Sequence, residues 1–200
     1  MQKVSLKDIQ TMAKEAKSDL KSTAKDFGRE IKIYLHWTAG RYDTTFTDYH
    51  INITGDGTIY ASTPDLGATL CHTWKRNSGS IGVALCCACN ATSNNLGAYA
   101  PTETQIDVMA QVCCVLADAL DIPIDKQHVL THGEAADNED GRWIHPMYGP
   151  NSTCERWDLE FLGTKESPKF NPKATDGSRG GDVLRGKANW YKENGLLNQI

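Results

Sequence analysis

The sequence lacks any long apolar run. A membrane-spanning helix needs roughly 20 consecutive apolar residues, and no stretch of the chain approaches that length. The N-terminal segment MQKVSLKDIQTMAKEAKSDL also lacks the apolar core and small-residue cleavage site of a secretory signal peptide. We therefore expect cytoplasmic synthesis without a signal peptide, and no membrane insertion.

An excess of positive charge is also missing. The chain carries 21 basic and 25 acidic side chains, which gives a formal net charge of −4. This balance excludes a broad basic field of the kind that attracts nucleic acid, so we expect no nucleic-acid partner. Hydrophobic residues make up 40% and charged residues 23% of the 200 residues, which is typical of a globular domain with its own core.

Cysteine, by contrast, is plentiful. Seven cysteines are present, so at least one is unpaired in a monomer. Without an export signal, reduced thiols are the default. Three of them lie in the apolar segment SIGVALCCAC, where the adjacent Cys86 and Cys87 would project to opposite faces of a strand. Cys87 and Cys89 share a face, but two thiols alone make a poor zinc site. We expect these three side chains to fill the core.

Helical periodicity predicts three helices. Apolar residues recur at helical spacing over residues 5–27, with Ser5 as N-cap and Gly28 as the stop signal. A second helix opens at residues 101–102, where Thr102 and Gln105 have capping-box spacing. A third helix closes the chain over residues 182–197.

Strands are predicted between the first two helices and after the second. They cover residues 31–37, a hairpin around the TGDG turn, residues 81–89, and the short segment HVLTH. The order of elements predicts one α/β domain with a mixed central β-sheet flanked by helices.

Two histidines lie at the C-terminal ends of predicted strands: His36 in YLHWTAG and His132 in LTHGEAAD. An α/β sheet exposes its functional groups at this edge. A single histidine there is more often structural than functional, but two in equivalent positions indicate a shared site.

Five segments occur in the order LHWTAG, DYHINITGDGTIY, SIGVAL, LTHGEAAD and RWDL. This order resembles the type 2 N-acetylmuramoyl-L-alanine amidases, a family that includes phage endolysins and peptidoglycan recognition proteins. The resemblance covers residues 31–163. It implies an amidase type 2 fold and a zinc hydrolase that cuts the amide between N-acetylmuramic acid and L-alanine. On this basis residues 29–164 form the catalytic domain, 1–28 a helix packed on it, and 165–200 an arm and closing helix of the same domain.

The resemblance also implies a set of zinc ligands. His36 and His132 match the two family histidines, and Asp158 in RWDL matches the third ligand, which is Cys or Asp in relatives. Two imidazoles and a carboxylate suit Zn²⁺ and leave a fourth position for water, whose pKa the metal lowers to about 7. Cys154 and His145 lie near the same segment and remain alternatives to Asp158.

Other site residues carry over from the family in the same way. Tyr49 matches a tyrosine that faces the reaction centre, with core packing as the alternative, and Arg156 stands where relatives have lysine and could stabilise the oxyanion. Many relatives have a catalytic Glu where this chain has Ala84. Glu134 is then a candidate base, or a residue that supports a ligand. His50, which follows Tyr49 in the sequence, is expected to be a buried structural histidine.

Substrate contacts are predicted for Trp37 and Thr38, which follow the first ligand, and for His72 and Asn77 in the loop before the apolar strand. The alternative for His72 is a solvated loop residue. The predicted partner is peptidoglycan or a soluble muropeptide. A monomer is assumed, and the oligomeric state is open.

Three other interpretations compete with the zinc enzyme. A Cys/His amidase would use a thiolate nucleophile with His132 as base. A peptidoglycan-binding module would bind the wall without cutting it. The N-terminal helix and C-terminal arm could also bind a regulatory protein. The biological setting is either a phage or prophage endolysin, which acts on the wall after release, or a cytoplasmic enzyme of muropeptide recycling.

Overall fold

The computed structural model describes residues 1–141, 149 and 156–200. A six-stranded sheet forms its centre, in the order β1-β4-β3-β5-β2-β6. The strands are β1 (Gln2–Lys3), β2 (Lys32–Trp37), β3 (Ile51–Ile53), β4 (Ile59–Ala61), β5 (Ser80–Leu85) and β6 (Val129–Thr131). β3, β5, β2 and β6 are parallel, whereas β4 and β1 are antiparallel to their neighbours. The expected mixed α/β fold is confirmed, and β1 is an addition that the sequence pattern did not predict.

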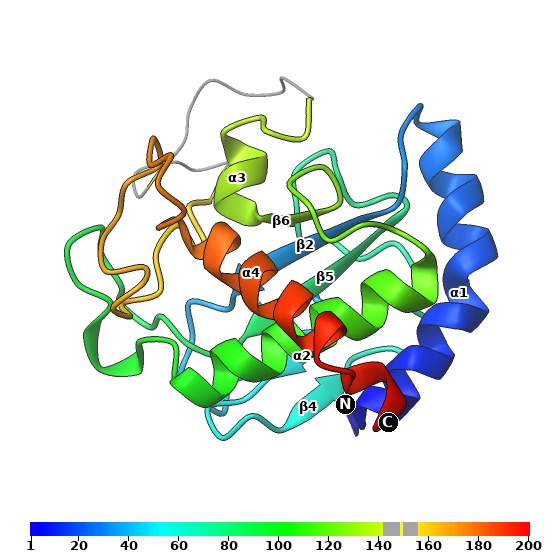
Figure 1. Ribbon diagram of the computed structural model, residues 1–200, viewed down its shortest axis with the longest axis horizontal. Helices are drawn as coiled ribbons and strands as arrows, with labels where there is room; N and C mark the ends of the chain where they lie inside the picture. Colours follow the sequence, from blue (N-terminus) through cyan, green and yellow to red (C-terminus); the bar gives the residue numbers. More distant parts are fainter. Residues whose placement is uncertain (142–148, 150–155) are drawn as a thin grey trace.

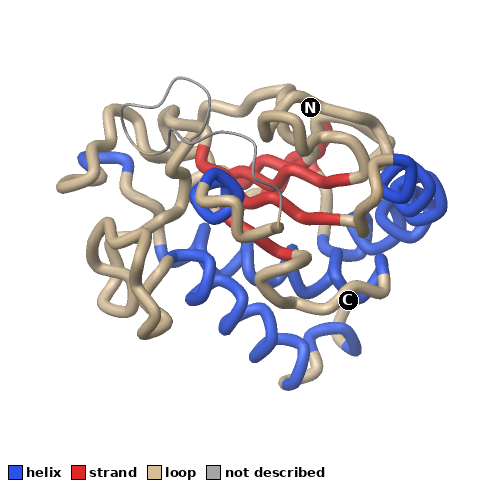
Figure 2. The backbone as a smooth tube through the Cα atoms, turned by 90° about the horizontal axis from the view of Figure 1, so that it is seen from above, coloured by secondary structure: helices blue, strands red, loops and turns tan. Residues whose placement is uncertain are grey.

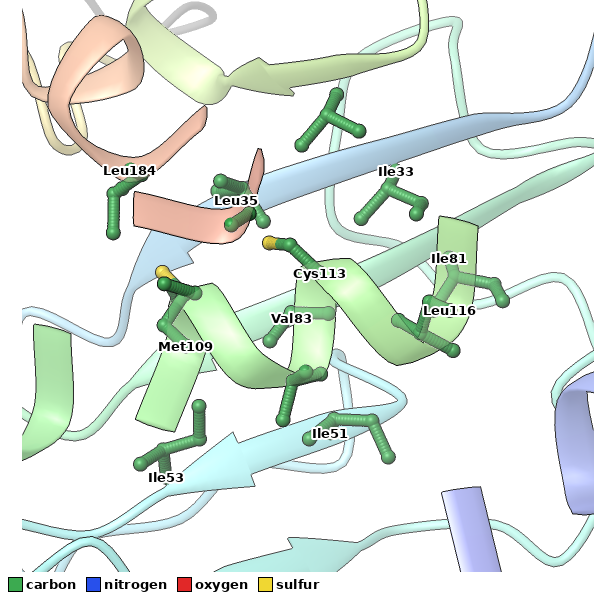
Figure 3. Packing of buried hydrophobic residues seen from close by; sticks show 14 of the residues in the cluster. Ile33, Leu35, Ile51, Ile53, Ile81, Val83, Met109, Cys113, Leu116 and Leu184 are labelled. Atoms are coloured by element: carbon green, nitrogen blue, oxygen red, sulfur yellow. The ribbon is translucent and has the colours of Figure 1, made fainter. Parts of the chain in front are cut away.

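Alternation along β2 separates two chemically different faces. Ile33 and Leu35 belong to the main apolar cluster, whereas Tyr34 and His36 project to the other side. The apolar side chains of β3 and β5 meet those of β2 beneath α2 (Figure 3). The opposite face of the sheet therefore carries the polar side chains Tyr34 and His36 of β2. Every residue of β2 and β5 is buried.

Helix α2 (Glu103–Leu120) covers the apolar face together with α4 (Gly180–Glu193) (Figures 1 and 2). The predicted capping box is present: the Thr102 side chain accepts from the backbone of Gln105, whose side chain accepts from the backbone of Thr102. Met109, Cys113 and Leu116 point from α2 into the sheet (Figure 3). The Gln105 amide donates to the carbonyls of Ile53, the last residue of β3, and of Cys86, just after β5, both at 3.0 Å, so it fixes α2 at this end of the sheet.

Helix α1 (Leu6–Asp26) packs against α2 and lies beside the sheet (Figure 1). Ser5 and Asp8 form its N-terminal capping box. The apolar side of the helix is buried, as its periodicity predicted. No helix in the described part of the chain combines the length and apolar character that crossing a bilayer requires.

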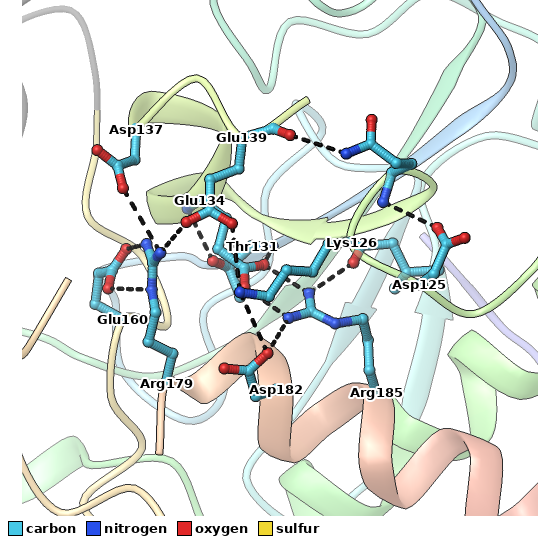
Figure 4. Close-up of polar contacts among 12 residues, drawn as sticks. Asp125, Lys126, Thr131, Glu134, Asp137, Glu139, Glu160, Arg179, Asp182 and Arg185 are labelled. Carbon is cyan, nitrogen blue, oxygen red and sulfur yellow. Dashed lines mark hydrogen bonds and ion pairs between the residues drawn. The ribbon is translucent and has the colours of Figure 1, made fainter. Parts of the chain in front are cut away.

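The short helix α3 (His132–Ala136) follows β6 without a linker. Thr131 caps it and accepts from the backbone of Glu134. Two buried arginines hold the surrounding segments: Arg185 of α4 contacts Glu134, and Arg179 contacts Glu160 (Figure 4). Glu160 follows Asp158 closely in the sequence, so these ion pairs fix the segments on both sides of the predicted metal site.

Two segments differ from the sequence expectation. The apolar strand expected over residues 81–89 ends at Leu85, and Cys86 and Cys87 lie beyond it, although both are buried. The abundance of Gly, Pro and charged residues in segment 137–150 predicts an exposed loop, but Asp140 is buried because it pairs with Arg76 and accepts from the hydroxyl of Tyr34. A pattern within one segment does not report such partners from distant segments.

Candidate metal centre

The three predicted ligands converge on one buried point. Ligand atoms of His36, His132 and Asp158 all lie within 4.8 Å of one another. Asp158 Oδ2 is 3.4 Å from Nδ1 of His36 and 3.4 Å from Nδ1 of His132. The imidazole rings of the two histidines meet edge to face, with centroids 4.8 Å apart. Both histidines therefore present the same ring nitrogen to the carboxylate.

The parallel sheet explains this convergence. β2 and β6 are adjacent parallel strands, with Leu35 opposite Thr131, so the next residues, His36 and His132, lie side by side at the same end of the sheet. The third side chain arrives from a distant segment, and the backbone N–H of Gly133 donates to the Asp158 carbonyl at 3.2 Å. A Cβ at Gly133 would lie 2.4 Å from a side-chain oxygen of Glu160, so glycine leaves room for that buried carboxylate.

Protonation states at the centre suit metal binding. Burial lowers the pKa of His36 to about 4, which keeps the imidazole neutral at pH 7. Burial acts to raise the pKa of Asp158, but the contacts of its carboxylate with His132 and His36 outweigh burial and bring the pKa to about 2. Zinc requires neutral histidines and an ionised carboxylate, so these groups can bind the metal without first losing a proton.

The donor set also fits zinc in number and type. Two imidazole nitrogens and one carboxylate oxygen form the three-ligand set of a catalytic zinc site, which keeps one position for a reactant. All three side chains are almost fully buried, so the protein shields the site from bulk water. Cys154 and His145, the alternatives to Asp158, lie outside the described residues.

A cavity of about 310 Å³ opens beside the centre. Trp37, Arg156 and Asp158 contribute to its wall. The Trp37 ring packs edge to face on Trp157 at 4.9 Å, so it is both a wall of the cavity and part of the core. Arg156 is exposed. These two predicted site residues therefore lie together with Asp158, the predicted third ligand, around one hollow.

Tyr49 lies against the first ligand, with its ring centroid 5.0 Å from that of His36. Burial raises the pKa of Tyr49, and the nearby Asp158 adds to the effect, so its hydroxyl stays protonated. The hydroxyl is 3.5 Å from the carbonyl of Trp37. The adjacent His50 is buried with both ring nitrogens bonded to backbone groups of Ala68 and Gly82, which confirms its expected structural role.

The structure places Glu134 in an ion pair. Its two oxygens each accept from Arg185 at 2.7 Å, and one also accepts from the backbone N–H of Thr131 at 2.9 Å. This position favours the second of its two predicted roles, support for the segment that carries His132. Ala84 occupies the position at which many relatives have a glutamate. It is buried and lies opposite His36 in the β2–β5 register.

The remaining predicted contacts lie in two loops. The Thr38 N–H donates to the Leu85 carbonyl at 2.9 Å, and its hydroxyl accepts from Gly40. Asn77 accepts the N–H groups of His72 and Thr73 at 3.0 and 2.7 Å. His72 is buried, with Nδ1 3.3 Å from Nε2 of His36. The structure therefore brings His72 to the candidate centre, directly behind His36, whereas Asn77 shapes the loop.

Sequence reasoning missed Thr73, whose hydroxyl lies 3.3 Å from His36 Nε2. It also missed the fully buried Arg76, which pairs with Asp140 at 2.6 Å. The segment CHTWKRNSGS, which contains both, has no regular period. Its concentration of polar residues immediately before a buried strand was the one available signal.

Comparisons with known proteins address the same residues. A family model described as N-acetylmuramoyl-L-alanine amidase matches residues 17–147, which include His36 and His132 and end before Asp158. The endolysin N-acetylmuramoyl-L-alanine amidase LysCS from Clostridium intestinale URNW is a similar solved structure, with 20% identity and a TM-score of 0.41 over 60% of this chain and 78% of that one. No curated protein matches the sequence. Because the family model spans more than half of the chain, the protein belongs to the N-acetylmuramoyl-L-alanine amidase family of type 2.

Proposed function

We propose that this protein is a zinc-dependent amidase that hydrolyses the bond between N-acetylmuramic acid and L-alanine in peptidoglycan. The observation that carries the proposal is the buried convergence of His36, His132 and Asp158 beside a cavity. Zinc bound there would polarise the scissile carbonyl and lower the pKa of a water molecule. The family match supplies the bond that is cut.

The chain's own residues have separate roles in this proposal. Tyr49, kept protonated by burial, donates a hydrogen bond to the oxygen that gains negative charge. The exposed guanidinium of Arg156 lies at the cavity and supplies a positive charge to the same oxygen or to a carboxylate of the stem peptide. Trp37 forms an apolar wall against which the substrate packs. Glu134 supports the His132 segment through Arg185 and takes no proton.

The test uses purified protein loaded with zinc and isolated sacculi. We expect new free L-alanine amino termini, without new reducing sugar ends, and loss of this release after chelation with recovery on adding zinc. The His36→Ala variant is the matched control and should release none. Zinc-loaded protein that binds sacculi but releases no amino termini would instead identify a binding module.

The setting that we propose is cell-wall lysis of the phage endolysin type, in which the enzyme reaches the wall after release from the cytoplasm. This setting rests on the family resemblance. Comparing rates on intact sacculi and on soluble muropeptides tests it, because a lytic enzyme must act on the polymer. Faster cleavage of soluble muropeptides than of sacculi would identify a recycling enzyme instead.

A further inference from the structure

Behind the first ligand, away from Asp158, lies a row of buried polar side chains. It consists of Thr73, His72 and Ser80, which are 2%, 6% and 1% exposed, and it begins at His36, which is 0% exposed. Bulk water cannot satisfy groups buried to this degree, so their hydrogen bonds must be made within the protein.

The spacing joins these groups into one chain of hydrogen bonds. His36 Nε2 is 3.3 Å from Thr73 Oγ1, which is 2.9 Å from His72 Nδ1. His72 Nε2 is 3.5 Å from Ser80 Oγ. The Ser80 hydroxyl lies 2.9 Å from the carbonyl of Arg76 and 2.8 Å from that of Asn77. The row therefore starts at a predicted zinc ligand and ends on two backbone carbonyls.

The two carbonyls at the end of the row determine which group donates and which accepts in each of its hydrogen bonds. A carbonyl oxygen only accepts, so the Ser80 hydroxyl must donate to it. Ser80 Oγ then accepts from Nε2–H of His72, which leaves Nδ1 of His72 without a proton. The Thr73 hydroxyl donates to that Nδ1 and accepts from Nε2–H of His36. Each group donates once along this direction, and Nδ1 of His36 keeps its lone pair.

We propose that Ser80, His72 and Thr73 act as positioning residues that fix the tautomer of His36 before any metal binds. The row holds the proton on Nε2, and the free lone pair of Nδ1 points toward Asp158 and His132, where the proposed zinc site lies. The inference rests on the proposed function for the identity of the metal. It gives His72 a role behind the ligand in place of the predicted contact with substrate.

The opposite tautomer conflicts with the same contacts. With the proton on Nδ1, His36 would donate to Asp158, and its Nε2 would have to accept from Thr73. Each later hydrogen bond would then reverse, and the Ser80 hydroxyl would donate to His72. The single O–H of Ser80 would then turn away from the two carbonyls and leave the oxygen's lone pairs against them in a buried setting, which is unfavourable.

The loop that carries the row is held in place from three sides. Asn77 accepts the N–H groups of His72 and Thr73. The His72 ring lies over Gly82, where an added Cβ would be 2.7 Å from the ring. Arg76 anchors the loop to Asp140 through a fully buried ion pair. The row is therefore built into the fold and does not depend on a mobile side chain.

The direct test measures the tautomer in metal-free protein by long-range ¹H–¹⁵N correlation of the histidine rings. We expect the His36 pattern of a neutral ring protonated at Nε2, and the same pattern for His72. A His36 ring protonated at Nδ1 would overturn the proposal. Because no metal or substrate is present, this outcome is independent of whether the protein is an amidase.

A second test measures zinc affinity by competition with a chromophoric chelator. Thr73→Val keeps the shape of the side chain and removes the hydroxyl, so zinc should bind about 10- to 100-fold more weakly. Thr73→Ser restores the hydroxyl and should recover most of that loss. The matched control is Thr54→Val in the β3–β4 hairpin, which removes a hydroxyl that donates to Asp56, and it should leave zinc affinity unchanged.

The two measurements separate failure of this inference from failure of the proposed function. Thr73→Val with wild-type zinc affinity and an unchanged His36 tautomer would contradict the positioning role while leaving the zinc amidase intact. A purified wild-type protein that binds no zinc would contradict the proposed function, whereas the tautomer measurement in the same sample would still decide the inference.

Discussion

His36 and Ala84 are Cα partners in the parallel strands β2 and β5. Ala84 is fully buried, and its methyl group lies on the same face of the sheet as the imidazole. A glutamate at this position, as in many relatives, would place a carboxylate next to the candidate metal centre. The chain instead has a small apolar side chain there.

Ala84→Glu tests the consequence of this pairing. An unpaired carboxylate at a fully buried position should destabilise the metal-free protein by on the order of 3 kcal/mol. Zinc should recover part of this loss, because a nearby cation favours the ionised carboxylate. Thermal unfolding with and without zinc measures both effects. Ala84→Gln is the neutral control, and an equal stabilisation of both variants by zinc would argue against a carboxylate close to the metal.

The ligand assignment predicts a clear difference between two candidate ligands that lie close together in the sequence. Asp158→Ala should lose stoichiometric zinc, because it removes the oxygen that both histidines face. Cys154→Ser should keep zinc, and His36→Ala and His132→Ala should each lose it together with activity. Metal content after dialysis measures this. Loss of zinc in Cys154→Ser with retention in Asp158→Ala would reverse the assignment.

Thiol reactivity separates the zinc enzyme from a Cys/His amidase. Burial raises the pKa of Cys86 and of Cys113 to about 12, so almost no thiolate forms at pH 8 and both should resist iodoacetamide. Among the cysteines in the described part of the chain, the exposed Cys71 should react first. Peptide mapping by mass spectrometry, combined with activity, follows the reaction. Activity should persist after Cys71 is alkylated, and loss of activity in step with one modified cysteine would favour a thiolate mechanism.

Glu134→Gln distinguishes a supporting residue from a general base. The change keeps the shape but removes the charge that pairs with the buried Arg185, so stability should fall by about 3 kcal/mol. Zinc should still bind stoichiometrically, and the turnover rate at a temperature where the variant is folded should fall less than about 10-fold. If turnover instead slows by about 100-fold or more while stability is unchanged, Glu134 is the base.

Tyr49→Phe should act on the reaction and not on the metal. Loss of the hydroxyl removes a hydrogen-bond donor beside His36, so kcat/KM should fall about 100-fold, as for other oxyanion donors. Zinc affinity should stay the same as in the wild type. If Tyr49 only packs in the core, Tyr49→Phe will lower neither kcat nor kcat/KM.

Local patterns predicted much of the fold. The capping boxes at Ser5 and Thr102, and the periodicity behind them, placed both ends of α1 and the start of α2 within one or two residues of those observed. These signals are reliable because caps and helical periods involve residues close in sequence. The end of β5 at Leu85 was not predictable in this way, because the apolar run continues through residues that leave the sheet but stay buried.

The sequence by itself determined the chemical types of the site: two histidines at strand ends and an aspartate in a family motif. Only the tertiary structure decided how they meet and what surrounds them. The segment of Asp158 is held beside that of His132 by a backbone hydrogen bond from Gly133, which also leaves room for the side chain of Glu160. Glu134 is committed to Arg185, and Thr73 and His72 stand behind His36. Such contacts join segments far apart in the chain, and their geometry is set by packing and buried hydrogen bonds, which no local pattern encodes.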